Sequence, residues 1–237
     1  MLDTSLRSAK DSALQSVAAR MESVSPGAVS WAGLTAGLAT AGLVVAQLYW
    51  WGLLAWWLNR VLDGLDGTLA RVHGRQSDWG GYLDMVLDLS VYAVVLVSFL
   101  WGGSKLVLGL GAIVLALFYV NIGQLFLSSA ILEKIKHQPG AAARRRQVGT
   151  NGRLTTLELP TTLVEGAETV VLYSLLFVFV GQLPVVLGLM ILAMAITIGQ
   201  RFSWAWRTLA GGTDRTGTDV SGSASTATGK TGPTRTL

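Results

Sequence analysis

Six long apolar segments make up most of this chain, and they restrict the folds that it can adopt. They lie at about residues 29–47, 48–72, 79–101, 105–132, 161–180 and 183–206. Each is long enough to cross a hydrocarbon core, which takes about 20 residues of helix. Backbone polar groups find no water inside a bilayer, so a spanning segment of this kind has to be helical. The sequence therefore predicts an all-α integral membrane protein with six transmembrane helices.

The composition agrees with this class and excludes others. Of the 237 residues, 51% are hydrophobic and only 14% are charged, as expected for a membrane protein. The chain has no cysteine, which excludes a disulfide framework and thiol chemistry. Its net charge of +4 is modest, and no basic groove with interleaved aromatic residues suggests a nucleic-acid partner.

The two ends of the chain differ from the apolar middle. Residues 1–25 predict an amphipathic helix that lies in the membrane interface or, as an alternative, packs on its own protein. Its apolar stripe consists of Leu6, Ala9, Ala13, Leu14, Val17 and Met21. Residues 26–210 are expected to form the six-helix transmembrane domain. Residues 211–237 are rich in Gly, Ser and Thr, and we expect a disordered cytoplasmic tail.

Basic residues predict the orientation in the membrane. Arg71 and Arg75 lie between the second and third segments, and Arg144–Arg146 lie between the fourth and fifth. These connections are on the same side of a six-helix protein, and the opposite side has little beyond Lys105. The positive-inside rule then places the Asp-rich stretch and both termini in the cytoplasm, in a cell membrane of bacterial type.

One stretch, residues 63–88, interrupts the apolar pattern with charge. Asp63 and Asp66 share a helical face with Arg71, and Asp84 and Asp88 share a face of the next segment. Two helices joined by a short turn can therefore point all four carboxylates at one another. One such aspartate would best be explained as a helix cap or an interfacial surface charge. Four on two matching faces indicate a functional site, because charge inside a membrane is costly.

The residue types suggest what this site binds. Four carboxylates so close together need compensating positive charge, which hard divalent cations with oxygen ligands supply. Four carboxylates can hold two such ions. Gly67 and Gly80 leave room for an approach to the helix backbone, and the guanidinium of Arg71 suits a phosphate.

The stretch also resembles a known family. The pattern D-x2-D-G-x2-A-R-x8-G-x3-D-x3-D is the signature of the CDP-alcohol phosphotransferases, membrane enzymes of phospholipid synthesis, and every position matches. The number of predicted helices and the place of the motif in the second and third are similar to the family as well. The resemblance implies transfer of a phosphatidyl group from CDP-diacylglycerol to an alcohol acceptor, with CMP as the leaving group.

The resemblance also implies residue roles. It gives Mg²⁺, or Mn²⁺ as a substitute, as the cofactor, with two ions expected. Asp88 is expected to act as the general base as well as lying beside the metal. The expected metal ligands are Asp63, Asp66, Asp84 and Asp88. The expected cradle for the CDP moiety consists of Gly67, Ala70 and Arg71, with Gly80 allowing close approach.

The acceptor is not identified by the sequence. Glu165 and Glu168 either contact the acceptor or only complement a helix dipole, and Arg201 either binds a phosphate or only anchors its helix. The two glutamates favour an amino- or polyhydroxy-alcohol over a phosphorylated acceptor. Homodimers are common in the family, although no stretch here specifies one.

Two other functions are consistent with intramembrane acids. A metal-ion or proton transporter also uses intramembrane carboxylates. However, the acids lie at one end of the helices, and no inverted repeat is visible. An inactive, family-like scaffold is the second alternative, and the complete motif argues against it.

Overall fold

The computed structural model describes residues 14–136 and 166–207, where all regular elements are helices. The predicted all-α class is therefore confirmed. The principal helices are α2 (Pro26–Val45), α3 (Tyr49–Val72), α4 (Asp78–Leu100), α5 (Lys105–Lys136), α7 (Gly166–Val178) and α8 (Leu183–Ala205), with a short 3₁₀ helix, η1 (Val180–Gln182), before α8.

Four stretches in these ranges are long and apolar enough to cross a membrane. They are Pro26–Val45, Asp78–Leu100, Lys105–Lys134 and Val180–Ala205. Helix α3 is also 24 residues long, but it carries four charged residues from its middle to its C-terminal end: Arg60, Asp63, Asp66 and Arg71. Helix α7 has 13 described residues. The membrane class is thus supported by four spans, while the full count of six stays a prediction.

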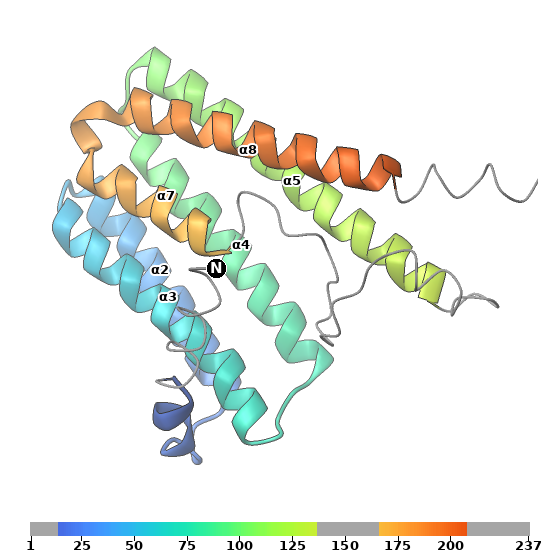
Figure 1. Ribbon diagram of the computed structural model, residues 1–237. Helices are drawn as coiled ribbons and strands as arrows, with labels where there is room; N and C mark the ends of the chain where they lie inside the picture. The colour runs from blue at the N-terminus through green and yellow to red at the C-terminus, as the bar shows by residue number, and fades with distance from the viewer. Residues whose placement is uncertain (1–13, 137–165, 208–237) are drawn as a thin grey trace, which may run out of the picture.

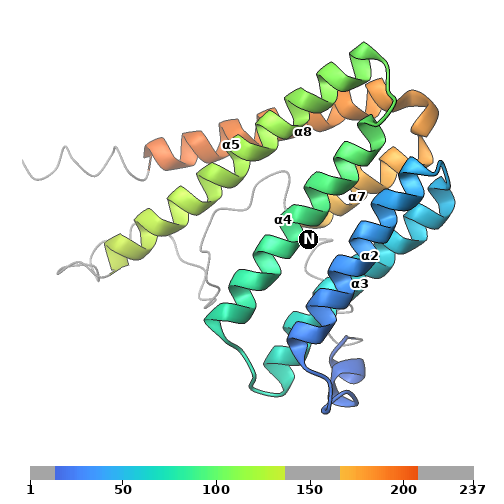
Figure 2. The ribbon, with the colours of Figure 1, turned by 180° about the vertical axis from the view of Figure 1, so that it is seen from behind.

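The helices form two groups (Figures 1 and 2). Helix α2 packs against both α3 and α4, and α7 packs against α3. Helices α5 and α8 lie side by side and extend away from the other four. Since α2 contacts both of its neighbours, it holds α3 and α4 at fixed positions on either side of it.

The turn between α3 and α4 follows from its sequence. Gly74 adopts a left-handed conformation with φ 62°, which favours glycine, directly after the end of α3. The Arg75 amide then donates to the Ala70 carbonyl at 2.8 Å, which closes the helix end. Ser77 caps α4 by accepting from the Gly80 amide at 3.0 Å. The chain therefore turns back within the five residues 73–77, and the predicted short turn between the two helices is confirmed.

Close packing of α2 depends on a small residue. A Cβ atom at Gly37 would lie 3.2 Å from Val91 Cβ in α4 and closer still to its methyl groups. Small residues that let helix backbones approach are typical of membrane helix interfaces. Gly37 therefore sets the spacing between α2 and α4.

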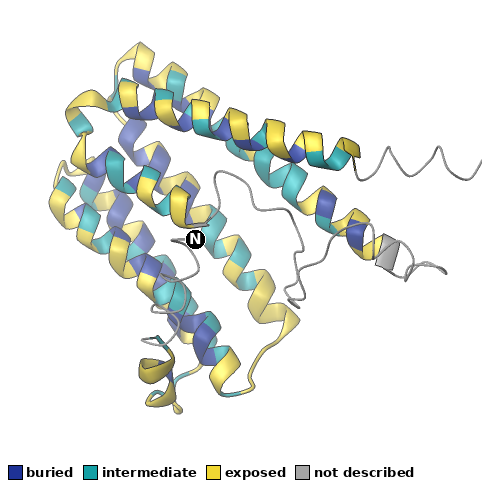
Figure 3. Cartoon of the chain, in the orientation of Figure 1, coloured by how far each residue is buried: buried dark blue, intermediate teal, exposed yellow. Residues whose placement is uncertain are grey.

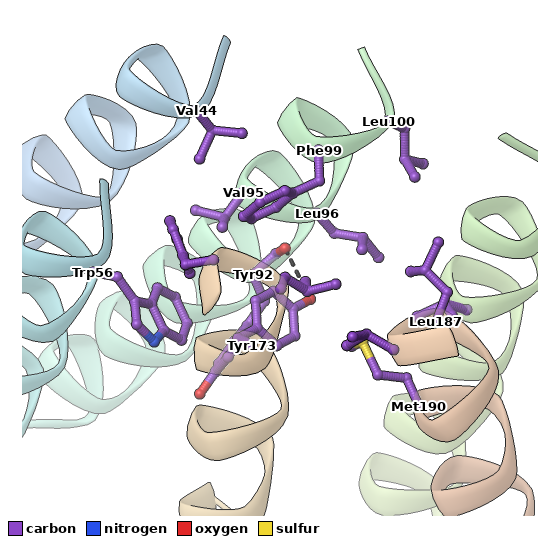
Figure 4. Close-up of a cluster of buried hydrophobic side chains, with 14 of the residues drawn as sticks. Val44, Trp56, Tyr92, Val95, Leu96, Phe99, Leu100, Tyr173, Leu187 and Met190 are labelled. Carbon is purple, nitrogen blue, oxygen red and sulfur yellow. Dashed lines mark hydrogen bonds between the residues drawn. The ribbon is translucent and has the colours of Figure 1, made fainter. Parts of the chain in front are cut away.

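The buried core lies where α3, α4, α7 and α8 meet. It includes Trp56, Tyr92, Tyr173, Leu187 and Met190, and Figures 3 and 4 show the buried stripes and these side chains. Large apolar side chains such as Leu54, Leu127 and Leu192 are exposed on the outer faces. In a membrane these outward faces would contact lipid.

Residues 14–19 are helical and pack on the ends of α2 and α3. Ala18 is fully buried in a small cluster with Val29, Leu65 and Leu69. His73 Nε2 lies 2.9 Å from the Ala18 carbonyl. This contact matches the alternative in which the N-terminal helix packs on its own protein. Residues 1–13 of that predicted helix, and the predicted tail at 211–237, lie outside the described residues.

Candidate active site

A pocket between α3 and α4, with α2 behind it, is lined by all four predicted aspartates. Asp63 and Asp66 come from α3, and Asp84 and Asp88 come from α4. Helix α2 contributes Ser30, Gly33 and Leu34, whereas Leu87 and Val91 of α4 add apolar lining. The structure thus brings together the four carboxylates that the helical spacing pointed at one another.

Asp66 is the most enclosed of the four. It is 4% exposed and accepts hydrogen bonds on both carboxylate oxygens. The Ser30 hydroxyl in α2 donates to Oδ2 at 2.6 Å, and the Gly67 amide donates to Oδ1. Bonds to an ionised carboxylate are roughly twice as strong as neutral ones, so they fix its orientation firmly.

The pocket also contains a cation that the family signature does not include. Arg60 lies one helical turn before Asp63 and is only 8% exposed. Its Nη1 donates to Asp88 Oδ1 at 2.5 Å, and the same atom lies 3.8 Å from Asp63 Oδ2. Arg60 therefore links the acidic residues of α3 and α4 across the pocket.

The guanidinium of Arg60 is held by hydrogen bonds along its edges and by contact with two aromatic rings. Asn59 Oδ1 accepts from Nε at 2.8 Å and also from Nη2, while Nη1 donates to the Tyr92 hydroxyl at 3.1 Å. The Arg60 Cζ atom lies 4.8 Å from the ring centroid of Trp56 and 4.7 Å from that of Tyr92. These distances are within cation–π range.

A second set of contacts fixes the groups that hold Arg60. Asn59 Nδ2 donates to the Gly33 carbonyl of α2 at 2.8 Å. Tyr173 of α7 stacks on Trp56 with ring centroids 5.2 Å apart, and its hydroxyl donates to the Tyr92 carbonyl at 3.0 Å (Figure 4). Four helices thus support this one side chain.

The donor set suits a hard divalent cation. The acidic ligands offer only oxygen, the atom that Mg²⁺ and Mn²⁺ prefer. Within residues 14–136 and 166–207, however, no three acidic or histidine side chains converge on one point as they stand. Asp88 Oδ1 and both Asp66 oxygens already accept hydrogen bonds. The residues therefore fit a metal by their chemistry, and some side chains must turn to hold one.

The residues expected to hold the CDP moiety do not line this pocket. Arg71 is exposed, and its Nη2 donates to Thr68 Oγ1 at 3.0 Å. A Cβ atom at Gly67 would lie 3.3 Å from Arg71 Nη1, so the glycine leaves room for that guanidinium. Gly80 is exposed in the first turn of α4, and Ala70 is half-buried. These four residues lie on the helices of the motif but outside the pocket lining.

Of the three candidate acceptor residues, the two that the structure describes, Glu168 and Arg201, do not line the pocket. Arg201 is buried in α8, and its Nη1 donates to Asn121 Oδ1 of α5 at 2.9 Å. This bond matches the anchoring alternative, and it shows that Asn121 makes an interhelical hydrogen bond. Glu168 is exposed in the first turn of α7. Glu165 and Arg144–Arg146 lie outside the described residues.

The sequence indicates a functional role for Arg60, although the family motif does not include it. Arg60 stands three residues before Asp63, so it shares the helical face of the aspartates. It is also a cation within an apolar segment, which by itself indicates a functional role. The family signature starts at Asp63 and therefore leaves out the helical turn that carries this arginine.

Three comparisons relate this chain to known proteins. The family model described as CDP-alcohol phosphatidyltransferase matches residues 24–200. Inner membrane protein YnjF of Escherichia coli (strain K12) is 33% identical over 155 residues, which cover 64% of this chain and 68% of that protein.

A solved structure shares the fold. It is the phosphatidylinositol phosphate synthase of Mycobacterium tuberculosis with CDP-DAG bound. The TM-score is 0.57 at 21% sequence identity, with 81% of this chain and 93% of that chain covered. At this identity the likeness shows the fold alone.

Proposed function

This chain belongs to the CDP-alcohol phosphatidyltransferase family, and we propose that it transfers a phosphatidyl group from CDP-diacylglycerol to an alcohol with release of CMP. The observation that carries this proposal is the pocket in which all four aspartates of the signature meet. The CDP-DAG in the Mycobacterium tuberculosis neighbour supports the choice of donor. The inner-membrane relative supports a cell membrane as the location.

The pocket residues can supply the metal ligands and the base that the reaction needs. Asp63, Asp66 and Asp84 would hold divalent metal, which supplies charge neutralisation for the donor's pyrophosphate. Asp88 would accept the proton of the acceptor hydroxyl while the hydroxyl oxygen attacks the phosphorus attached to the lipid. The bond from that phosphorus to the CMP phosphate oxygen then breaks, and CMP leaves.

The nucleotide and the acceptor would approach the pocket from the side on which the exposed residues of the motif lie. Arg71 is exposed close to the pocket and offers a fork of donors for a phosphate. Gly67, Ala70 and Gly80 would let the CDP moiety lie against the helices. Among the described pocket residues the single cation, Arg60, is already paired with Asp88. This pairing supports an amino- or polyhydroxy-alcohol acceptor over a phosphorylated one.

We also propose six transmembrane helices, with the pocket and both termini on the cytoplasmic side. Four spans meet the length and hydropathy that a membrane requires. Three of the four charged residues of α3, Arg60, Asp63 and Asp66, line the pocket, and Arg71 lies in its last turn, which supports α3 as a fifth span. A homodimer and an interfacial N-terminal helix complete the proposal.

The test is CMP release by the full-length protein in detergent–lipid micelles. The assay contains CDP-diacylglycerol, Mg²⁺ and one acceptor at a time from a panel of amino-, polyhydroxy- and phosphorylated alcohols. We expect CMP with one acceptor class, and we expect EDTA to abolish it. Asp88→Asn should lower kcat by at least about 100-fold, because a general base contributes roughly that factor. Lys105→Gln, beyond the far end of α4, is the control.

Other outcomes would contradict the proposal. No CMP from protein that binds neither CDP nor metal would support the scaffold alternative. Movement of ⁴⁵Ca²⁺ or ⁵⁴Mn²⁺ into proteoliposomes without nucleotide would support a transporter instead.

A further inference from the structure

The family signature does not include Arg60, and nothing in the reaction as proposed uses it. Among the described residues that line the pocket it is nevertheless the one cation, and it contacts the residue expected to act as base. On the basis of the proposed function, we propose that Arg60 is a positioning residue that orients Asp88 and serves as the resident counter-cation of the acidic pocket.

The first step in the argument is that Arg60 cannot move freely. A guanidinium has five N–H donors, and hydrogen bonds from Nε, Nη1 and Nη2 hold it to Asn59, Tyr92 and Asp88. The rings of Trp56 and Tyr92 lie 4.8 and 4.7 Å from Cζ. Trp56 is fully buried, so the cage cannot open without disturbing the core.

A fixed guanidinium in turn fixes the carboxylate that it contacts. Asp88 Oδ1 receives the bond from Arg60, whereas Oδ2 accepts no hydrogen bond from the described part of the chain. The Asp88 side chain is 30% exposed. One oxygen is therefore held while the other stays accessible to an acceptor hydroxyl. Precise orientation of a reacting group lowers the barrier of the step in which it takes part.

The second role concerns charge. Arginine does not lose its proton in proteins, so Arg60 supplies a permanent positive charge to four carboxylates. Its Nη1 lies 2.5 Å from Asp88 and 3.8 Å from Asp63. A divalent cation entering the pocket would be attracted by the same carboxylates and repelled by Arg60. Arg60 therefore stabilises the metal-free pocket and weakens metal binding.

These two roles predict effects in opposite directions. Arg60→Gln should lower kcat for CMP release by at least about tenfold, since Asp88 loses its orientation. The same variant should bind Mn²⁺ at least about fivefold more tightly, since the repelling charge is gone. The KM for the acceptor should change less than kcat, because in this proposal Arg60 acts through Asp88. Loss of structure would weaken catalysis and metal binding together.

The experiment measures Mn²⁺ binding by electron paramagnetic resonance with the full-length protein in nanodiscs, without nucleotide. Steady-state CMP release is measured on the same samples. Arg60→Lys keeps the charge and loses the planar fork, so its Mn²⁺ affinity should stay near that of the wild type while kcat stays low. Lys105→Gln, a charge removed from the exposed end of α5, should change neither quantity.

A milder variant covers the case in which Arg60→Gln does not fold. Tyr92→Phe keeps the ring over the guanidinium and removes only the hydroxyl, at 3.1 Å from Nη1. It should lower kcat by about two- to threefold, because the guanidinium is held less firmly, and leave Mn²⁺ affinity near that of the wild type, because the positive charge remains.

The outcomes separate this inference from the proposed function. If kcat and Mn²⁺ affinity fall together in folded Arg60→Gln, or if neither changes, the inference is wrong. It is also wrong if Arg60→Gln does not fold and Tyr92→Phe leaves kcat unchanged. If the wild type releases no CMP with any acceptor, the proposed function is wrong. Even then, tighter Mn²⁺ binding by Arg60→Gln than by the wild type would support the counter-cation role.

Discussion

At the scale of single residues, the four aspartates differ in how they are held. Asp66 is buried and bonded to Ser30 and Gly67, whereas Asp84 is exposed. Asp88 is paired with Arg60, and Asp63 lies at the edge of the same ion pair. Equivalent positions in a motif are therefore not equivalent in their surroundings, and each carboxylate should respond differently to substitution.

Substitution of Ser30 tests whether catalysis requires the Asp66 carboxylate to be held in a fixed orientation. Ser30→Ala removes the 2.6 Å hydrogen bond to Asp66 Oδ2, which joins this carboxylate to α2. We expect kcat for CMP release to fall about tenfold, since a hydrogen bond to a charged group contributes roughly 1.5–3 kcal/mol. Metal titration of the activity should show a raised Mg²⁺ requirement.

The matched control for that change is Thr35→Ala. Thr35 lies on the same helix, and its hydroxyl donates to the Trp31 carbonyl in an exposed, local bond. It should leave activity unchanged. If Ser30→Ala retains wild-type kcat and Mg²⁺ requirement, the Ser30 bond has no part in holding Asp66 for catalysis.

At the scale of elements, helix α2 sets the shape of the pocket although it carries no part of the signature. It packs against both α3 and α4 and supplies Ser30, Gly33 and Leu34 to the lining. Its Gly33 carbonyl accepts from Asn59, which in turn holds Arg60. The spacing of the two acidic helices thus depends on how closely α2 approaches them.

Gly37→Ala tests this dependence. The added methyl group would collide with the Val91 side chain, so either α2 or α4 must shift. Overpacking of this kind costs about 1–3 kcal/mol of stability. We expect a lower unfolding temperature in detergent and reduced CMP release.

Gly42→Ala is the control on the same helix, because a Cβ atom added at Gly42 would meet no other atom within 4 Å. Alanine is also a better helix former than glycine, by about 1 kcal/mol. Gly42→Ala should therefore match or exceed the wild-type unfolding temperature. Equal stability of the two variants would show that close contact at Gly37 is unimportant.

At the scale of the whole molecule, the helices separate a polar pocket from apolar outer surfaces. The four aspartates lie at one end of α3 and α4, and the turn between these helices carries Arg75. Lys105 begins α5 directly after the turn at the opposite end of α4. A multi-pass arrangement of this kind allows a water-soluble nucleotide to reach the pocket from one side of the membrane.

The absence of cysteine makes this orientation directly measurable. Arg75→Cys and Lys105→Cys each introduce a single thiol at an exposed position. By the positive-inside rule, a membrane-impermeant maleimide should label the thiol at position 105 in intact cells and the thiol at position 75 only in inverted vesicles. The reverse labelling pattern would place the pocket outside the cytoplasm. Equal labelling of both in intact cells would indicate leaky cells, which labelling of a cytoplasmic marker protein would reveal.

The sequence by itself determined the helical class, the short turn between the two acidic helices and the meeting of the four aspartates. These features depend on local periodicity: apolar length specifies a membrane helix, and i, i+3 and i+4 spacing specifies a face. The predicted bounds of 79–101 and 183–206 differ from those of α4 and α8 by no more than one residue at either end.

Only the tertiary structure decided which partners those side chains have. Arg60 is paired with Asp88, 28 residues away, and caged by Trp56 and Tyr92. Ser30 reaches Asp66 from another helix, while Arg71, the cation that the motif emphasised, is exposed. Periodicity specifies the face of a helix, but the opposing group depends on how closely helices pack, which small residues such as Gly37 control across the bundle.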